Sequence, residues 1–269
     1  MDTQFVERNN IHEMGNLAAR ETILFAHGYG SDQTAWRFIT PAFEKDYHLV
    51  MYDLMGCGGS DVDSYNRSEY ESLYDYADDL IEICDRLELR QVTLVAHSVS
   101  GMIGALASIK RPGLFKRMVF IGASPCYLVD GDYNGGFTRD AVAGLLNAIG
   151  DNYLTWARGF APVAMNAPEQ PFLGDEFALS LSSMRPDVSL GIATTIFLSD
   201  HRKDLDTMEG PVLILQAHND VAVPDAVGEY LQRVIPGSRL QWISTNGHFP
   251  HLSNPAEVIE AIEGFLADV

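Results

Sequence analysis

Short apolar runs recur along this chain and alternate with longer amphipathic stretches. The runs cover residues 22–26, 49–52, 92–96, 118–121 and 212–216, and their length and composition indicate strands that are buried on both faces. In the stretch from residue 74 to 87, Tyr76, Leu80, Ile83 and Leu87 fall on one face of a predicted helix. Alternating strands and helices predict βαβ units, and hence an α/β fold with a mostly parallel, doubly wound sheet.

The alternation stops between residues 124 and 206. Helical periodicity and aromatic residues continue there without a strand-like run, and Pro162, Pro168, Pro171 and Pro186 divide the segment into short helices. An all-helical insertion between two strands of a sheet is typical of a lid. We therefore expect a core formed by residues 1–124 and 207–269, with residues 125–206 inserted as a helical lid.

The charge of the chain restricts its partners. Lys and Arg number 18 against 37 Asp and Glu, which gives a net charge of −19. Such a field repels polyanions, so we expect neither nucleic acid nor an anionic membrane surface as a ligand. No apolar run approaches the roughly 18 residues that a membrane-spanning helix needs, and a hydrophobic content of 46% is that of an ordinary globular protein.

The first residues show no basic segment followed by an apolar one, so we expect no secretory signal. Cys57, Cys84 and Cys126 are an odd number without the spacing of a metal site. These features favour reduced thiols and a cytoplasmic location.

A candidate nucleophile, Ser98, stands where a strand passes into a helix. The sequence from residue 96 to 100 is Ala-His-Ser-Val-Ser, which resembles the G-x-S-x-G nucleophile elbow with Ala96 and Ser100 in place of the two glycines. Both substitutes are small, as the close approach of strand and helix requires. The alternative is a serine that merely ends a strand.

An oxyanion hole would need two backbone N–H groups near this serine. The segment His27-Gly28-Tyr29-Gly30 follows the strand at residues 22–26, which is where such enzymes place one of the donors. We expect the amides of Tyr29 and Val99 to be the donors, since Val99 also opens a helix.

An acid and a histidine follow in the order that a triad on this fold requires. Asp220 comes directly after the strand at residues 212–216, and His248 lies in a loop after a further strand-like run at residues 240–243. We expect Asp220 to orient His248, and His248 to remove the proton of Ser98. Asp225 and His251 are the nearest rivals for these two roles.

Two other sequence patterns, for a metal site and for a dinucleotide-binding loop, are weaker. His248 and His251 are spaced like metal ligands, but Pro250 lies between them and no H-E-x-x-H pattern occurs. The glycines of segment 53–60 resemble a dinucleotide-binding loop, but Asp61 stands where the third glycine belongs. We expect no metal at His248 and His251. We expect segment 53–60 to form a tight turn packed near the site.

Taken together, these residues resemble the α/β-hydrolases, and among them the group of the bacterial stress regulator RsbQ and the plant strigolactone and karrikin receptors. The resemblance covers nearly the whole chain. It is carried by residues 27–33, 96–100, 124–128, 133–137, 156–162, 184–187 and 197–202, several of which lie in the predicted lid. The chain departs from the group at Ala96, usually glycine, and at Tyr29, commonly an aromatic without a hydroxyl.

The resemblance implies a V-shaped lid of four helices over a narrow hydrophobic pocket, with the triad at its floor and no metal or organic cofactor. The residues expected near a ligand are Tyr29, His97, Val99, Phe137, Trp156, Phe160 and Phe197. In the plant receptors the serine attacks a butenolide ester, and the hydrolase also recruits protein partners as a signal sensor.

Three hypotheses follow. The first is a serine hydrolase that cleaves a small apolar ester or lactone through an acyl-enzyme. The second is a ligand-sensing signalling protein with slow hydrolysis and a protein partner, and the third is a general short-chain carboxylesterase without a signalling role. A haloalkane dehalogenase is disfavoured, because that chemistry needs a carboxylate where Ser98 stands.

Overall fold

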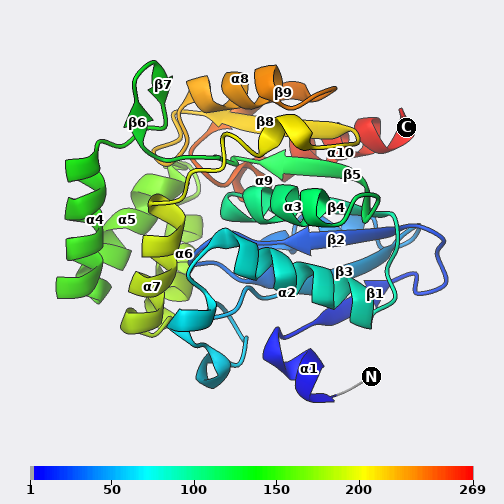
Figure 1. Cartoon of the computed structure of the whole chain (residues 1–269), viewed down its shortest axis with the longest axis horizontal. Coiled ribbons are helices and arrows are strands. Elements are labelled where there is room, and N and C mark those ends of the chain that lie inside the picture. Colours follow the sequence, from blue (N-terminus) through cyan, green and yellow to red (C-terminus); the bar gives the residue numbers. More distant parts are fainter. Residues whose placement is uncertain (1–2, 269) are drawn as a thin grey trace.

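A seven-stranded sheet runs through the molecule (Figure 1), whose computed structural model describes residues 3–268. The strand order is β1-β3-β2-β4-β5-β8-β9, and in this sheet β1 alone runs antiparallel to its neighbour. The strands are β1 (His12–Gly15), β2 (Thr22–Ala26), β3 (His48–Tyr52), β4 (Val92–His97), β5 (Phe115–Ile121), β8 (Val212–His218) and β9 (Arg239–Asn246). The predicted α/β fold with a mostly parallel sheet is confirmed.

Both faces of the sheet are covered, as its apolar strands predict. In β2, Leu24 and Ala26 face one core cluster, while Ile23 and Phe25 face the other. Residues of α2 (Leu73–Arg86), α3 (Val99–Lys110) and α8 (Asp225–Val234) belong to the first cluster. Residues of α10 (Pro255–Ala267) belong to the second, together with Trp36 of the short 3₁₀ helix Gln33–Trp36 (η1) and with Ile39 and Phe43, which flank the 3₁₀ helix Thr40–Ala42 (η2).

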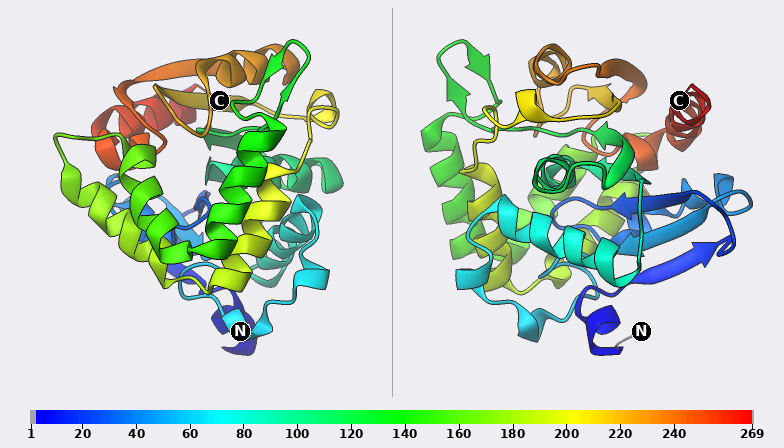
Figure 2. Two further views of the ribbon diagram at one scale, coloured as in Figure 1. Left: turned by 90° about the vertical axis from the view of Figure 1, so that its left-hand side faces the viewer. Right: turned by 45° about the vertical axis from the view of Figure 1, so that its right-hand side comes forward.

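Four helices follow β5 before the chain returns to the sheet: α4 (Arg139–Asp151), α5 (Tyr153–Met165), α6 (Pro171–Ser183) and α7 (Pro186–Phe197). Pro171 and Pro186 each occupy the first turn of their helix, where a missing N–H costs nothing. Figures 1 and 2 show these helices at the end of the sheet toward which the parallel strands point, with α4 beside α7 and α5 beside α6.

The remaining elements are short. They are the helices α1 (Thr3–Arg8) and α9 (Pro250–Ser253), the 3₁₀ helices Val62–Ser64, Arg67–Glu69 and Leu205–Thr207, and the strands β6 (Val129–Asp130) and β7 (Tyr133–Asn134). The expectation of a purely helical segment after residue 124 was therefore wrong at β6 and β7, which pair into a two-stranded hairpin. Two-residue strands are too short to show a periodicity in the sequence.

Cys57, Cys84 and Cys126 are free and buried, and burial raises the pKa of each thiol. Within residues 3–268, no helix has both the length and the apolar character needed to cross a bilayer.

Candidate active site

Ser98 lies at a sharp turn between β4 and α3. Its backbone has φ 57° and ψ −126°, a conformation that L-residues rarely adopt. The turn is held by a hydrogen bond from the Ser98 amide to the carbonyl of Ile121 at 2.8 Å. Helix α3 then passes so close to the sheet that a Cβ at Gly101 would lie 2.5 Å from that of Ala123. This is the geometry of a nucleophile elbow.

The two residues that replace glycine at the elbow fit without strain. Ala96 and Ser100 are both fully buried. The Ser100 hydroxyl donates a hydrogen bond to the carbonyl of His27 at 2.5 Å, and so joins the elbow to the loop after β2. Serine at this position therefore adds a contact that glycine lacks.

Ser98, His248 and Asp220 form one hydrogen-bonded chain. His248 Nε2 lies 2.8 Å from Ser98 Oγ, and His248 Nδ1 lies 2.7 Å from Asp220 Oδ2. An ionised carboxylate only accepts, so Nδ1 carries the imidazole proton and Nε2 is free to accept from the serine hydroxyl. All three residues are buried, with 6–7% of their surface exposed.

The rival residues lie elsewhere. The Asp225 carboxylate is exposed and lies 3.6 Å from His218 Nδ1. His251 is fully buried, and its ring packs against Trp36 at a centroid distance of 4.7 Å. In the described part of the chain, no three His, Cys, Asp or Glu side chains gather as a metal site would need.

A cluster of histidine rings lies behind the triad. The centroid of His97 lies 4.8 Å from that of His248 and 4.5 Å from that of His251. His97 Nε2 donates to the His248 carbonyl at 2.8 Å. Burial, helped by the neighbouring histidines, lowers the pKa of His97 and brings that of His251 to about 3, so both rings are neutral near pH 7.

His97 thus lies behind the triad, where it supports His248. Only 1% of its surface is exposed, which leaves little of the ring for the ligand contact that the sequence predicts.

The loop after β2 reaches the elbow, as predicted for an oxyanion hole. A Cβ at Gly28 would lie 2.7 Å from His97 Nδ1 and 3.0 Å from Ser98 Cβ, so only glycine allows this approach. Among residues 3–268, the Tyr29 and Val99 amides have no hydrogen-bond acceptor. Both remain free to bind an oxyanion.

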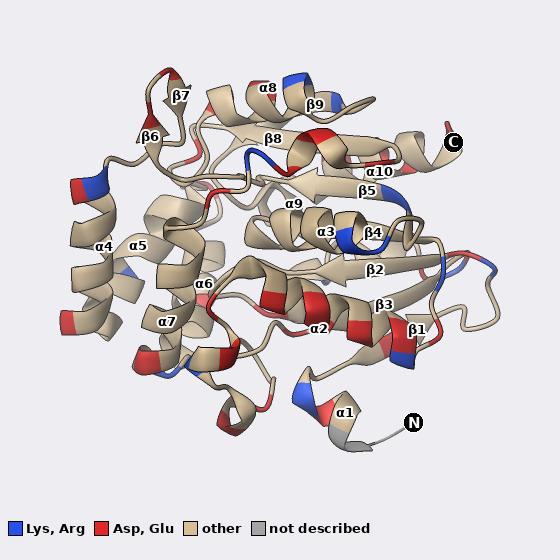
Figure 3. Cartoon of the chain, viewed as in Figure 1, with Lys and Arg blue, Asp and Glu red and all other residues tan. Residues whose placement is uncertain are grey.

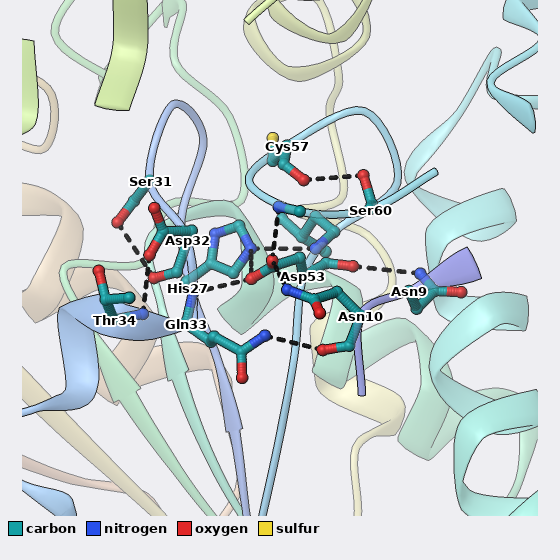
Figure 4. Close-up of polar contacts among 12 residues, drawn as sticks. Asn9, Asn10, His27, Ser31, Asp32, Gln33, Thr34, Asp53, Cys57 and Ser60 are labelled. Carbon is teal, nitrogen blue, oxygen red and sulfur yellow. Dashed lines mark hydrogen bonds and ion pairs between the residues drawn. The ribbon is translucent and has the colours of Figure 1, made fainter. Parts of the chain in front are cut away.

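A buried carboxylate holds this loop from the core side (Figure 4). Asp53, only 1% exposed, accepts hydrogen bonds from the amide of Gln33 at 2.8 Å, from Asn10 Nδ2 at 2.7 Å and from the amide of Gly59 at 2.8 Å. One side chain therefore fixes the loop after β2 beside the loop after β3.

The glycine-rich segment 53–60 is itself a closed turn. The Ser60 hydroxyl donates to the carbonyl of Cys57 at 2.7 Å and accepts from the amide of Gly56 at 3.0 Å. His27 Nε2, on the neighbouring loop, accepts from the amide of Leu54 at 3.0 Å. The prediction of a tight turn packed near the site is confirmed.

The four predicted pocket aromatics fall into two groups. Phe137 and Phe197 meet edge to face at a centroid distance of 5.6 Å. On α5, Trp156 and Phe160 are stacked at 5.3 Å. Phe197 is buried and the other three are half-buried.

Tyr127 is a site residue that the sequence analysis missed. Its ring packs against Phe197 at 4.9 Å. Burial raises the pKa of its phenol, and the nearby Ser98 hydroxyl opposes that rise. The phenol therefore lies near the candidate nucleophile. The sequence offered no signal for it beyond its place in segment 124–128.

Comparisons with known proteins show which family the chain resembles. Residues 23–261 match the model of the alpha/beta hydrolase family. The chain is 41% identical to strigolactone esterase D14 of Arabidopsis thaliana over 266 residues, covering 97% of this chain and 99% of that protein. It is 39% identical to the karrikin insensitive 2 receptor CA of Petunia hybrida over 257 residues, covering 95% and 94%.

Among solved structures, a hydrolase from Oleispira antarctica superposes with a TM-score of 0.94 at 35% identity. The match covers 98% of this chain and 97% of the other.

Proposed function

The chain belongs to the α/β-hydrolase family, and we propose that it is a serine esterase that cleaves a small apolar ester or lactone. The observation that carries the proposal is the chain of hydrogen bonds from Asp220 through His248 to Ser98. Each residue has the partner that its role in a triad requires.

The reaction follows from this geometry. Ser98 Oγ attacks the carbonyl carbon of the ester while His248 Nε2 takes its proton. The oxyanion that forms is held by the amides of Tyr29 and Val99, the second at the N-terminus of α3. His248 then gives the proton to the departing alkoxide, and water, activated by the same imidazole, releases the acid from Ser98.

The ligand would bind between the sheet and the four helices. We propose that residues 125–206 act as a lid on a core of residues 1–124 and 207–269. Phe137, Trp156, Phe160 and Phe197 would supply an apolar pocket, since such pockets are lined mainly by aromatic and aliphatic side chains.

The test is the steady-state hydrolysis of an activated short-chain ester by the wild type and by Ser98→Ala. The variant should lose roughly 10⁴ to 10⁶ of the rate, as expected for a triad serine. Ser108→Ala is the matched control, because this hydroxyl lies on α3 and, among residues 3–268, bonds only to the carbonyl of Ala105. Turnover retained in Ser98→Ala would refute the proposal.

A second candidate function is ligand sensing with slow hydrolysis. It is favoured by the likeness to relatives that are named receptors as well as esterases. In this case a protein partner would bind the ligand-loaded form, and the buried free thiols are compatible with a cytoplasmic location.

Time courses with a fluorogenic butenolide and a simple fluorogenic ester separate the two candidates. A burst followed by very slow turnover of the butenolide would support a sensor that keeps its product bound. Fast linear turnover of the simple ester, with the butenolide left intact, would support a general esterase.

A further inference from the structure

The loop that carries the oxyanion donor is bonded to two of the overlying helices. Tyr29 Oη lies 2.5 Å from Ser189 Oγ on α7, and it also donates to the carbonyl of Ser189 at 3.3 Å. The hydroxyl of Ser180 on α6 donates to the carbonyl of Gly30 at 2.9 Å. Two consecutive residues of the loop are thus tied to different helices.

These contacts are partly buried. Ser189 is fully buried, and a Cβ at Gly30 would lie only 2.4 Å from Leu181 Cδ1 on α6. Burial raises the pKa of Tyr29, so its hydroxyl keeps the proton that it donates. A hydrogen bond in such surroundings is strengthened, and a partner left unpaired there is costly.

On its other side the same loop is bonded to the core. Asp53 accepts from the amide of Gln33, and Ser100 donates to the carbonyl of His27. The core contacts fix both ends of the loop. Between them, Tyr29 contacts α7, and Ser180 of α6 contacts Gly30 and, at 3.5 Å, Asp32 Oδ2.

The loop that carries the base also contacts these helices. The amide of His248 donates to the carbonyl of Ala164 on α5 at 2.8 Å. A Cβ at Gly247 would lie 2.2 Å from the carbonyl oxygen of Met165. Three of the four helices therefore contact the two loops that carry the oxyanion donor and the base: α5 and α6 through backbone groups of the loops, and α7 through the Tyr29 side chain.

We propose that Tyr29 and Ser180 are positioning residues, through which α6 and α7 set the place of the Tyr29 amide in the oxyanion hole. The inference rests on the proposed function, because it concerns the same hydrolysis. Hydrolysis then depends on the lid, because the oxyanion hole is complete only while α6 and α7 hold their present positions. A ligand or partner that displaces them would slow attack by Ser98 without touching the triad.

The test compares kcat and KM for a neutral activated short-chain ester in Tyr29→Phe, Ser180→Ala and the double variant. Each single variant should lower kcat roughly tenfold and leave KM within about twofold, since a displaced donor fails in the transition state only. The double variant should lose more than either single variant, and because the two ties hold consecutive residues of one loop, their effects should be coupled instead of simply multiplied. Hydrogen exchange of the amides at residues 28–32 should become faster in the same variants.

Two substitutions serve as matched controls. Tyr52→Phe removes a buried hydroxyl that has no hydrogen-bond partner among residues 3–268. Ser183→Ala removes a hydroxyl on α6 whose only hydrogen-bond partner in the described part of the chain is the carbonyl of Ser180. Both should keep the wild-type kcat and exchange.

Three results would overturn the inference: a double variant within twofold of the wild-type kcat, a rise in KM alone, or unchanged exchange at residues 28–32. A rise in KM alone would mean that the hydroxyls bind substrate instead of placing the loop. Activity retained in Ser98→Ala would instead refute the proposed function, so the two failures can be told apart.

Discussion

The two carboxylate oxygens of Asp220 have different hydrogen-bond partners. Oδ1 accepts hydrogen bonds from the amides of Ala222 and Val223 at 2.8 and 3.1 Å, while Oδ2 faces His248. In Asp220→Asn the remaining oxygen can still hold the two amides, so the loop should keep its shape. The new NH₂ group would face Nδ1 and force the wrong tautomer on His248. We expect kcat to fall by about 10⁴ with the fold intact.

Steady-state kinetics and a circular dichroism spectrum check this prediction. Asp225→Asn is the matched control, since this carboxylate is exposed and lies beside His218 instead. Asp220→Asn with more than a tenth of the wild-type kcat would contradict the assignment of the acid.

The histidine cluster makes stability depend on pH. The pKa of His251 falls from an ordinary value of 6.5 to about 3 on folding, and that of His97 is also lowered. Between these values the unfolded chain binds more protons than the folded one, so stability is full above pH 6.5 and is lost as the pH falls. Each histidine should contribute a slope approaching 1.4 kcal/mol per pH unit, by linkage at about 25 °C.

Urea unfolding of the wild type and His251→Phe between pH 7 and pH 4 measures this effect. Neither ring nitrogen of His251 has a partner among the described residues, so phenylalanine loses no hydrogen bond there. The variant should lose less stability on acidification. Equal slopes in both proteins would contradict the prediction.

At the scale of the elements, the site depends on the close approach of α3 to the end of β5. A Cβ at Gly101 would lie 2.5 Å from that of Ala123, whereas a Cβ at Gly264 on α10 meets nothing within 4 Å. Gly101→Ala should therefore destabilise the fold by roughly 1–3 kcal/mol through overpacking. Gly264→Ala should stabilise it by about 0.5–1 kcal/mol, because alanine favours a helix interior.

Thermal unfolding of both variants is the measurement. The unfolding midpoint should fall in Gly101→Ala and rise in Gly264→Ala. The same shift in both variants would show that α3 does not approach the sheet closely at Gly101.

The elements that the sequence predicted are those with a strong pattern. The run at residues 22–26 is apolar because both of its faces are buried, and it matches β2 at both ends. The strand β1 went unpredicted, because it lies at the sheet edge with His12, Glu13 and Gly15 exposed and so lacks an apolar run.

The order of serine, acid and histidine was predictable because each residue follows a predicted strand. The contacts of Tyr29 and Tyr127 were not, because their partners lie on elements distant in the sequence: 160 residues separate Tyr29 from Ser189. Spacing along a chain shows which residues share an element, and says little about which elements meet.

At the scale of the whole molecule, the dominant property is the net charge of −19. Figure 3 shows acidic residues spread over the fold and grouped along α2. Such a field disfavours the approach of an anionic substrate and leaves a neutral one unaffected. The KM for an ester that carries a free carboxylate should therefore fall several-fold when the salt concentration rises from about 20 to 300 mM, as screening shortens the range of the field.

The matched neutral ester should show no change in KM over the same range. If both esters respond alike, the salt acts on the protein itself, and electrostatic selection of the substrate is refuted.

The backbone of Ser98 has a consequence for the evolution of such a chain. Its φ of 57° and ψ of −126° cost on the order of 1–3 kcal/mol for an L-residue, whereas glycine adopts this conformation readily. A change to glycine would thus favour the folded state, and under the proposed function it would also abolish hydrolysis. Selection for folding alone would then remove the serine, whereas selection for the proposed hydrolysis would keep it at the expense of stability.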